Sequence, residues 1–243
     1  MLESKSLAFG FLVVLIAGII ALSGCLKEEE TADYVEITEY EGEKLSSIND
    51  FRENAIKGPQ YLEKERYVLK ITGLVENLGN YTYEEIINTF ERQKKVVKLD
   101  CVEGWSVTIF WEGVAVSDLL EAANPSPKAK VIIFHAYDGY TTSFPIEYIK
   151  DNRIIMAYMM NNVTLPPERG FPFQLVAESK WGYKWIKWIT EIELSDDVNY
   201  KGYWERRGYS NSGNVNESFL EPKKRTYLGL VRRNSSYVTL ISV

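Results

Sequence analysis

Short apolar runs, separated by turn residues, recur along most of this chain and restrict its fold more than any other feature of the sequence. Helices are predicted only over short segments, one of which opens with the capping box Thr82-Tyr83-Glu84-Glu85 and runs to about Gln93. Many strands with few, short helices indicate a β-rich α+β domain rather than a repeated βαβ fold. The predicted strands cover residues 67–75, 95–102, 107–111, 130–137, 140–144, 153–160, 173–177 and 185–194.

The first 24 residues have the pattern of an export signal. Residues 7–22, LAFGFLVVLIAGIIAL, are uncharged and lead to Ser23-Gly24-Cys25. This ending resembles a lipobox, in which the Cys25 thiol accepts a lipid and the cysteine becomes the new N-terminus. A single transmembrane anchor is the alternative, since the stretch is near the lower length limit for spanning. In both cases we expect the folded domain outside the cytoplasm, anchored to the outer face of the cell membrane.

The charge pattern indicates how the chain divides into segments. The net charge and the cysteine count argue against several classes of protein. We expect a signal peptide over 1–24, a lipidated cysteine and acidic flexible tether over 25–44, one folded domain over 45–213, and a C-terminal extension packed on it over 214–243. Lys plus Arg total 28 against 34 Asp plus Glu, so the net charge of −6 argues against a nucleic-acid partner. One histidine and two cysteines exclude zinc fingers and clusters held by several cysteines.

Cys101 is the only thiol left if Cys25 carries lipid. It lies at the end of a predicted strand, in Asp100-Cys101-Val102-Glu103-Gly104-Trp105, just before a glycine turn. A free cysteine is commonly a small buried residue. A soft thiolate at a strand end also suits a metal centre that already has sulfur ligands. Both interpretations are open from this segment alone.

Two further segments carry candidate anion-binding groups. Lys180, Lys184 and Lys187 fall within KWGYKWIKW, where their ammonium groups suit a phosphate or else form a solvated strand face. The loop LPPERGFPFQ carries Arg169, which suits an anion clamp or a surface turn.

Together these blocks are more specific than any one of them. CVEGWS, GYTTSFP at 139–145, LPPERGFPFQLV, KWGYKWIKWITEIEL and GYWERRGYSNSG at 202–213, in this order, resemble the sulfite-oxidase-like molybdopterin oxidoreductase domain. The resemblance covers roughly residues 45–213. It implies the β-rich mixed fold of that family and a molybdenum–molybdopterin cofactor, with tungsten also possible. It makes Cys101 the metal ligand and the catalytic residue.

The resemblance also implies a set of cofactor-binding residues. Trp185, Ile186 and Lys187 match the strand whose backbone and lysine hold the pterin phosphate, with Lys184 assisting. Gln174 stands where relatives usually carry an arginine, which removes a positive charge from the phosphate site. The other implied contacts to the pterin are Arg52 and Asn54 in an early polar loop, the backbone of Ala136, and Arg169 before the Gly-Phe-Pro turn.

The residues after Cys101 bear on the substrate. Sulfite oxidation in this family needs an arginine soon after the metal cysteine, whereas this chain has Glu103 and no cation there. The CVEGWS block instead resembles the branch of periplasmic methionine-sulfoxide reductase catalytic subunits. That branch implies oxygen-atom transfer on a sulfoxide-like or other small neutral substrate. His135 either lines the pocket or is a hydrogen-bonded strand residue, and the second interpretation is favoured.

Two expectations follow from residues and motifs that the sequence lacks: a separate source of electrons, and one alternative function. With no haem or flavin motif, the enzyme needs a separate electron-transfer partner as well as its small-molecule substrate. The rival is a non-catalytic, cell-surface ligand-binding lipoprotein derived from the same fold, to which the Gln174 departure lends support.

Replacing Cys25 tests the anchor. Cys25→Ser removes the only thiol in the lipobox-like context, so the protein should leave the membrane fraction or remain there only with an uncleaved signal. Membrane fractionation and mass spectrometry of the N-terminus measure this. A lipid-modified N-terminus at any other residue would contradict the assignment.

Overall fold

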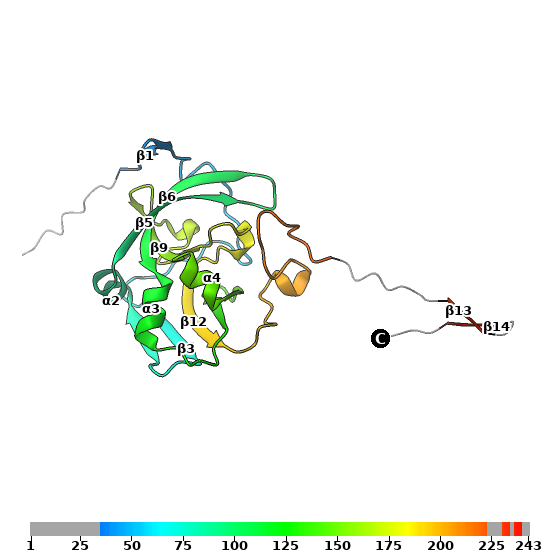
Figure 1. Cartoon of the computed structure of the whole chain (residues 1–243). Coiled ribbons are helices and arrows are strands. Elements are labelled where there is room, and N and C mark those ends of the chain that lie inside the picture. Colours follow the sequence, from blue (N-terminus) through cyan, green and yellow to red (C-terminus); the bar gives the residue numbers. More distant parts are fainter. Residues whose placement is uncertain (1–34, 223–229, 234–235, 240–243) are drawn as a thin grey trace, which may run out of the picture. The chain divides into compact units, whose positions relative to one another are not determined.

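The computed structural model describes residues 35–222, 230–233 and 236–239 (Figure 1). One five-stranded sheet holds the strand order β10-β9-β6-β5, with β11 also paired to β9, and all its pairs are antiparallel. Its strands are β5 (Arg92–Asp100), β6 (Ser106–Ala115), β9 (Ile155–Met160), β10 (Val163–Thr164) and β11 (Gln174–Val176).

The second five-stranded sheet has the order β4-β3-β12-β7-β8. Its β3 and β12 run parallel although more than a hundred residues separate them, and the other pairs are antiparallel. Its strands are β3 (Val68–Gly73), β4 (Gly79–Thr82), β7 (Val131–Ala136), β8 (Thr141–Pro145) and β12 (Ile189–Ser195).

The remaining elements are short. Two hairpins join β1 (Glu39–Tyr40) to β2 (Glu43–Lys44) and β13 (Leu230–Arg233) to β14 (Ser236–Thr239). Two mixed or antiparallel sheets with a few short helices confirm the predicted β-rich α+β class. The helices are α2 (Tyr83–Thr89), α3 (Val116–Ala123) and α4 (Ile146–Asp151), and the 3₁₀ turns are η1 (Pro167–Arg169), η2 (Gly182–Lys184) and η3 (Glu205–Arg207).

The capping box predicted for α2 is present, but the helix is shorter than expected. The Thr82 hydroxyl accepts a hydrogen bond from the Glu85 backbone, and the Glu85 carboxylate accepts one from the Thr82 backbone. The predicted extension to Gln93 is wrong, because Arg92 already begins β5 and pairs with Val114 of β6. Tertiary strand pairing therefore overrides local helix preference at this end.

The strand predicted over 185–194 begins only at Ile189. Residues Gly182–Lys184 form η2, and Trp188 has a φ of +53°, which extended backbone does not allow. Trp185, Ile186 and Lys187 therefore lie in an irregular segment that leads into β12. This segment forms part of the cavity described below.

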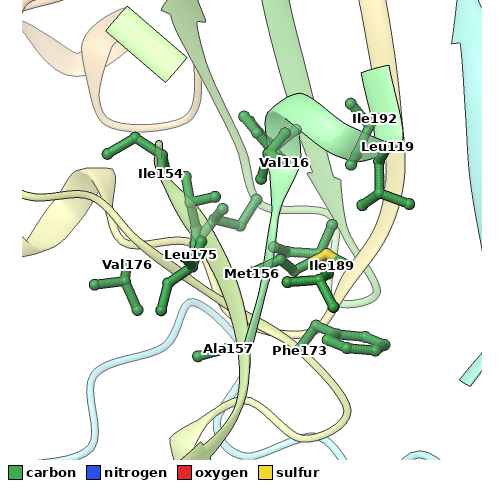
Figure 2. Close-up of a cluster of buried hydrophobic side chains, with 14 of the residues drawn as sticks. Val116, Leu119, Ile154, Met156, Ala157, Phe173, Leu175, Val176, Ile189 and Ile192 are labelled. Carbon is green, nitrogen blue, oxygen red and sulfur yellow. The ribbon is translucent and has the colours of Figure 1, made fainter. Parts of the chain in front are cut away.

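Strands of both sheets and helix α3 contribute to one hydrophobic core (Figure 2). The strands β9 and β11 are buried along their whole length, as expected of strands covered on both faces. Residues labelled in this cluster are Val116, Leu119, Ile154, Met156, Ala157, Phe173, Leu175, Val176, Ile189 and Ile192.

The folded region starts earlier than the boundary expected at residue 45. The Ile37 backbone N–H donates to the Asn161 carbonyl at 3.0 Å, and the Tyr40 ring stacks on Phe110 with centroids 3.9 Å apart. Residues 35–44 thus pack on the domain instead of forming part of a flexible tether. The signal peptide and Cys25 lie outside the described residues. Within the part of the chain that is described, no helix has the length and apolar character needed to cross a membrane.

Gly113 offers a test of how closely β6 and β9 approach. A Cβ at this position lies 2.3 Å from the Met156 carbonyl oxygen, where the strand register shifts. Gly113→Ala should therefore lower the free energy of unfolding by about 1–3 kcal/mol, the usual cost of overpacking. Chemical denaturation measures this change.

Gly182→Ala is the matched control. A Cβ there meets other atoms only at 3.5 Å or more, which is ordinary contact. Its free energy of unfolding should change by less than about 1 kcal/mol. Equal losses in the two variants would contradict the close approach of the strands.

Candidate active site

Cys101 occupies a tight turn at the end of β5. Its backbone N–H donates to the Trp105 carbonyl at 2.9 Å, and the Gly104 N–H donates to the Cys101 carbonyl at 3.0 Å. Gly104 has a φ of +88°, which favours glycine and closes the turn. The turn places Cys101, a residue that is 8% exposed, on the wall of a cavity.

That cavity has a volume of about 410 Å³, within the usual range for ligand pockets. It is lined by the loop after β2, the turn at Cys101, the loop at η1, the segment leading into β12, and the loop at η3. The lining residues are Phe51, Arg52, Glu53, Asn54, Ala55, Ile56, Leu99, Cys101, Val102, Glu103, Trp105, Asp138, Tyr140, Glu168, Arg169, Gln174, Gly182, Tyr183, Trp185, Ile186, Lys187, Trp188, Trp204 and Tyr209.

Backbone contacts bring the cysteine turn against the lysine-rich segment. Asp100 and Trp181 form a parallel β-bridge. Gly182 follows directly, and a Cβ on it would lie 3.7 Å from Cys101 Cα. Two blocks separated by about eighty residues in the sequence therefore meet at the thiol.

The surroundings of the Cys101 thiol shift its pKa. Burial raises its pKa, and the nearby Glu103 carboxylate acts in the same direction, although hydrogen bonds from the local backbone oppose it. Asn54 Nδ2 lies 3.9 Å from Cys101 Sγ, within the range of a weak N–H···S contact. Metal binding must displace the thiol proton, and the metal charge compensates the resulting thiolate.

Lys187 is the most enclosed cation of the cavity. Its ammonium donates to Glu53 Oε1 at 2.6 Å and to the Glu168 carbonyl at 3.1 Å, and it lies 4.4 Å from the centre of the Trp188 ring. Burial lowers its pKa, and the Glu53 carboxylate opposes this shift. An incoming phosphate therefore meets a lysine that already has an internal carboxylate partner.

Arg169 holds the polar loop over the cavity. Its guanidinium donates to the carbonyls of Ile48 at 3.0 Å and Phe51 at 2.7 Å, and it stacks on the Phe51 ring at 3.8 Å. Arg52 and Asn54 belong to this same loop and line the cavity with exposed side chains. Arg169 thus fixes the two predicted contact residues as well as lining the cavity itself.

Gln174 lies at the start of β11 and is 5% exposed. It lines the cavity, and no hydrogen bond joins its side-chain amide to another described residue. An amide at a cavity wall offers a hydrogen-bond donor and an acceptor to a bound ligand.

Two predicted contact residues do not line the cavity. Ala136 uses its backbone N–H and carbonyl to close the turn at Tyr140 and Gly139. Lys184 is fully buried and its ammonium pairs with Glu205 Oε1 at 2.7 Å. Its predicted assistance at the phosphate is wrong, because η2 directs this side chain into the protein and away from the cavity.

The contacts of His135 and of Lys180, the first lysine of the KWGYKWIKW segment, also show where these two residues lie. His135 Nε2 lies 2.9 Å from Glu193 Oε2 across β7 and β12, which confirms the strand interpretation. Lys180 donates to the Ser212 carbonyl and to Asn214 Oδ1, away from the cavity lining.

Sequence reasoning missed the aromatic part of the cavity. Tyr183, Trp204 and Tyr209 line it, and so do Asp138 and Tyr140. The segment GYWERRGY was used only as a mark of resemblance, and its abundance of aromatic residues was the available signal. Spacing along the chain does not show that Tyr183 and Tyr209 have ring centroids 5.1 Å apart.

Comparison with known proteins decides the family. The model of the oxidoreductase molybdopterin binding domain matches residues 56–204, which is more than half of the chain. This chain belongs to that family. It is a molybdopterin-dependent oxidoreductase, and family membership disfavours the non-catalytic ligand-binding alternative.

Individual relatives agree with this assignment. The chain is 32% identical to the uncharacterized oxidoreductase YuiH of Bacillus subtilis (strain 168), over 64% of this chain and 78% of that protein. It is 27% identical to the protein-methionine-sulfoxide reductase catalytic subunit MsrP of Pseudomonas syringae pv. tomato, over 82% of this chain and 64% of that protein.

A solved structure supports the same fold. The crystal structure of the sulfane dehydrogenase SoxCD from Paracoccus pantotrophus matches with a TM-score of 0.57 and 26% identity. The match covers 64% of this chain and 43% of the SoxCD chain. This chain therefore spans less than half of that protein and just under two thirds of MsrP.

The cavity residues fit a molybdenum-type pterin cofactor. The Cys101 thiol, a soft sulfur donor, opens into the same space as the partly buried ammonium of Lys187. The Gln174 amide can bind the polar edge of a pterin. Arg52, at the cavity mouth, adds a second cation for an anionic group. The donor set therefore suits a ligand with a metal at one end and a phosphate at the other.

Lys187→Ala tests the phosphate contact. A charge-assisted hydrogen bond contributes about 1.5–3 kcal/mol, so cofactor retention should fall about tenfold or more. Dialysis of holoprotein followed by measurement of the released pterin gives the off-rate. Lys180→Ala is the matched control, because Lys180 belongs to the same segment but lies outside the cavity lining. An unchanged off-rate in Lys187→Ala would remove Lys187 from the site.

Two other variants should not weaken retention of the cofactor. Glu53→Gln releases Lys187 from its internal carboxylate partner, so the phosphate no longer competes with that charge. Gln174→Arg restores the cation usual in the family. Both should retain the cofactor at least as tightly as the wild type in the same dialysis.

Proposed function

We propose that this protein is an extracytoplasmic, membrane-tethered oxidoreductase that transfers oxygen atoms and reduces a small neutral sulfoxide. One observation carries the proposal. The Cys101 thiol opens into a cavity with several aromatic lining residues, in which the charged residue nearest to it in sequence is Glu103 and not an arginine. The tether rests on Cys25 and on the apolar segment before it.

The charge next to the thiol disfavours sulfite as substrate. Glu103 Oε2 accepts a hydrogen bond from Trp105 Nε1 at 3.1 Å, which keeps the carboxylate at the cavity wall. A dianion approaching Cys101 is repelled by this carboxylate, whereas a neutral sulfoxide is not. Trp105 adds an apolar surface that favours an organic substrate.

The protein residues have separate tasks in this reaction. Cys101 ligates the metal, and Lys187 and Arg52 attract the phosphate. When bound, the cofactor supplies the two-electron redox centre for oxygen-atom transfer. Molybdenum is the proposed metal, and a thiolate ligand also suits tungsten.

The relatives support this choice of substrate and partner. MsrP is named as a methionine-sulfoxide reductase and as a catalytic subunit. The first part of that name supports a sulfoxide substrate for this chain. The second supports a separate protein that delivers electrons. The proposed lipid on Cys25 would keep the enzyme near such a partner at the outer face of the membrane.

Turnover of two substrates tests the proposal. Purified holoprotein with a reduced viologen dye should reduce dimethyl sulfoxide or a methionine sulfoxide faster than it oxidises sulfite with ferricyanide. Glu103→Arg should raise sulfite oxidation relative to the wild type, because it replaces a repulsive charge with an attractive one. Glu103→Gln is the control for loss of charge alone. Rapid sulfite oxidation without sulfoxide reduction in the wild type would contradict the proposal.

A further inference from the structure

The Cys101 sulfur is surrounded by N–H donors from two separate segments of the chain. The backbone N–H groups of Val102 and Glu103 donate to it from its own turn. The third donor is the side-chain amide of Asn54, whose Nδ2 lies 3.9 Å from Sγ although 47 positions separate the two residues. We call these three donors the sulfur cradle. Asn54 is the member of the cradle that tertiary structure supplies.

Arg169 fixes the first part of the loop that carries Asn54. Its guanidinium donates to the Phe51 carbonyl at 2.7 Å and stacks on the Phe51 ring at 3.8 Å. The Phe51 ring also packs on the Trp105 ring, with centroids 5.7 Å apart. Trp105 in turn accepts the hydrogen bond that closes the Cys101 turn. The loop and the cysteine turn are therefore packed against each other at Phe51.

An ion pair fixes the residue just before Asn54. Glu53 Oε1 accepts from Lys187 Nζ at 2.6 Å, and the two side chains are only 22% and 14% exposed. Lys187 Nζ also donates to the Glu168 carbonyl at 3.1 Å. The chain is thus held at Phe51 and again at Glu53, which restricts the directions in which the Asn54 side chain can point.

The Asn54–Cys101 contact should become stronger when the sulfur binds a metal. The sulfur then has the charge of a thiolate, and hydrogen bonds to charged acceptors are shorter and stronger than those between neutral groups. No other hydrogen bond joins the Asn54 amide to a described residue. The amide can therefore move closer to the thiolate without breaking another hydrogen bond.

We propose that Asn54 is a positioning residue that acts through the Cys101 sulfur and raises the reduction potential of the bound metal. An N–H dipole beside the thiolate stabilises the reduced state of the metal more than the oxidised state, because the reduced state has more negative charge. Hydrogen bonds around a cysteine ligand are a general means of setting a metal potential. The inference rests on one part of the proposed function, that Cys101 ligates the metal, and does not depend on the choice of substrate.

This role differs from the pterin contact that the family resemblance implies for Asn54. Loss of a pterin contact weakens retention of the cofactor and leaves the electron density of the metal–sulfur bond unchanged. Loss of an N–H···S contact changes that electron density and with it the reduction potential. The reduction potential therefore separates the two roles.

Potentiometric titration of the metal's EPR signal, on wild-type and Asn54→Leu holoproteins, tests the proposal. Leucine is similar in size to asparagine and has no side-chain N–H. We expect the equilibrium constant for one-electron reduction of the metal to fall about tenfold, which lowers the potential by about 59 mV. Asn49→Leu is the matched control, because Asn49 lies in the same loop, exposed and outside the cavity lining. The control should keep the wild-type potential.

A second variant covers the case in which Asn54→Leu does not take up the cofactor. Asn54→Asp keeps the shape of the side chain and replaces its N–H donors with a carboxylate, so its potential should fall further than that of Asn54→Leu. A wild-type potential in either loaded variant overturns the proposal, even if dialysis shows faster release of the pterin. Failure of both variants to load the metal also overturns it, because a residue that only tunes the sulfur is not needed for loading.

Turnover of dimethyl sulfoxide, measured on the same samples, separates this inference from the proposed function. A lowered potential in Asn54→Leu, combined with no sulfoxide reduction by the wild type, supports the role of Asn54 and contradicts only the proposed substrate. Sulfoxide reduction by the wild type, combined with equal potentials in all loaded variants, supports the substrate and contradicts the role of Asn54.

Discussion

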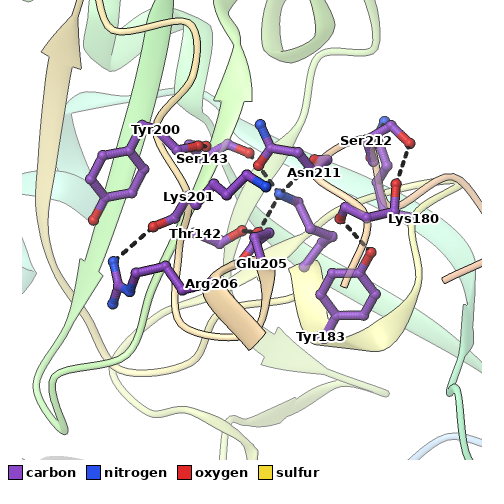
Figure 3. Close-up of polar contacts among 12 residues, drawn as sticks. Thr142, Ser143, Lys180, Tyr183, Tyr200, Lys201, Glu205, Arg206, Asn211 and Ser212 are labelled. Carbon is purple, nitrogen blue, oxygen red and sulfur yellow. Dashed lines mark hydrogen bonds and ion pairs between the residues drawn. The ribbon is translucent and has the colours of Figure 1, made fainter. Parts of the chain in front are cut away.

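The cavity depends on the buried ion pair between the Lys184 ammonium and the Glu205 carboxylate. Irregular segments form most of its lining, so their backbone groups cannot rely on a sheet ladder for hydrogen bonds. Lys184 joins three segments of the chain by donating to Glu205 in η3, to the Ser143 carbonyl of β8 and to the Asn211 carbonyl (Figure 3). Removing one partner of a fully buried ion pair leaves an uncompensated charge. The pair therefore makes the loop at η3 and the segment at η2 one rigid unit behind the site.

Much of the fold could be predicted because its signals are local. The Thr82–Glu85 capping box, the alternation of β3 and the apolar run of β7 involve neighbours in sequence, and the structure confirms them. The end of α2 and the start of β12 could not be predicted in this way. The first depends on pairing of Arg92 with Val114 across two strands, and the second depends on the positive φ of Trp188.

The candidate site can also be divided into features that the sequence predicted and features that depend on tertiary structure. The resemblance identified Cys101, Lys187 and Gln174, and the structure brings all three to one cavity. It did not separate Lys184 from Lys187, because the 3₁₀ turn that ends at Lys184 decides which side chain enters the cavity. Sequence reasoning missed the aromatic lining residues Tyr183, Trp204 and Tyr209, because they come from segments about twenty residues apart. Their proximity is a consequence of tertiary packing around Glu205 and not of any sequence spacing.

The central claim is that Cys101 is a metal ligand and not a packing residue. Serine is similar in size, but its hydroxyl is a harder ligand with a far higher pKa. X-ray absorption at the metal edge, on wild-type and Cys101→Ser holoproteins, measures the sulfur coordination directly. The account predicts one fewer sulfur ligand in the variant, with turnover at background and an intact fold. Equal sulfur counts and near-normal activity in the two proteins would contradict it.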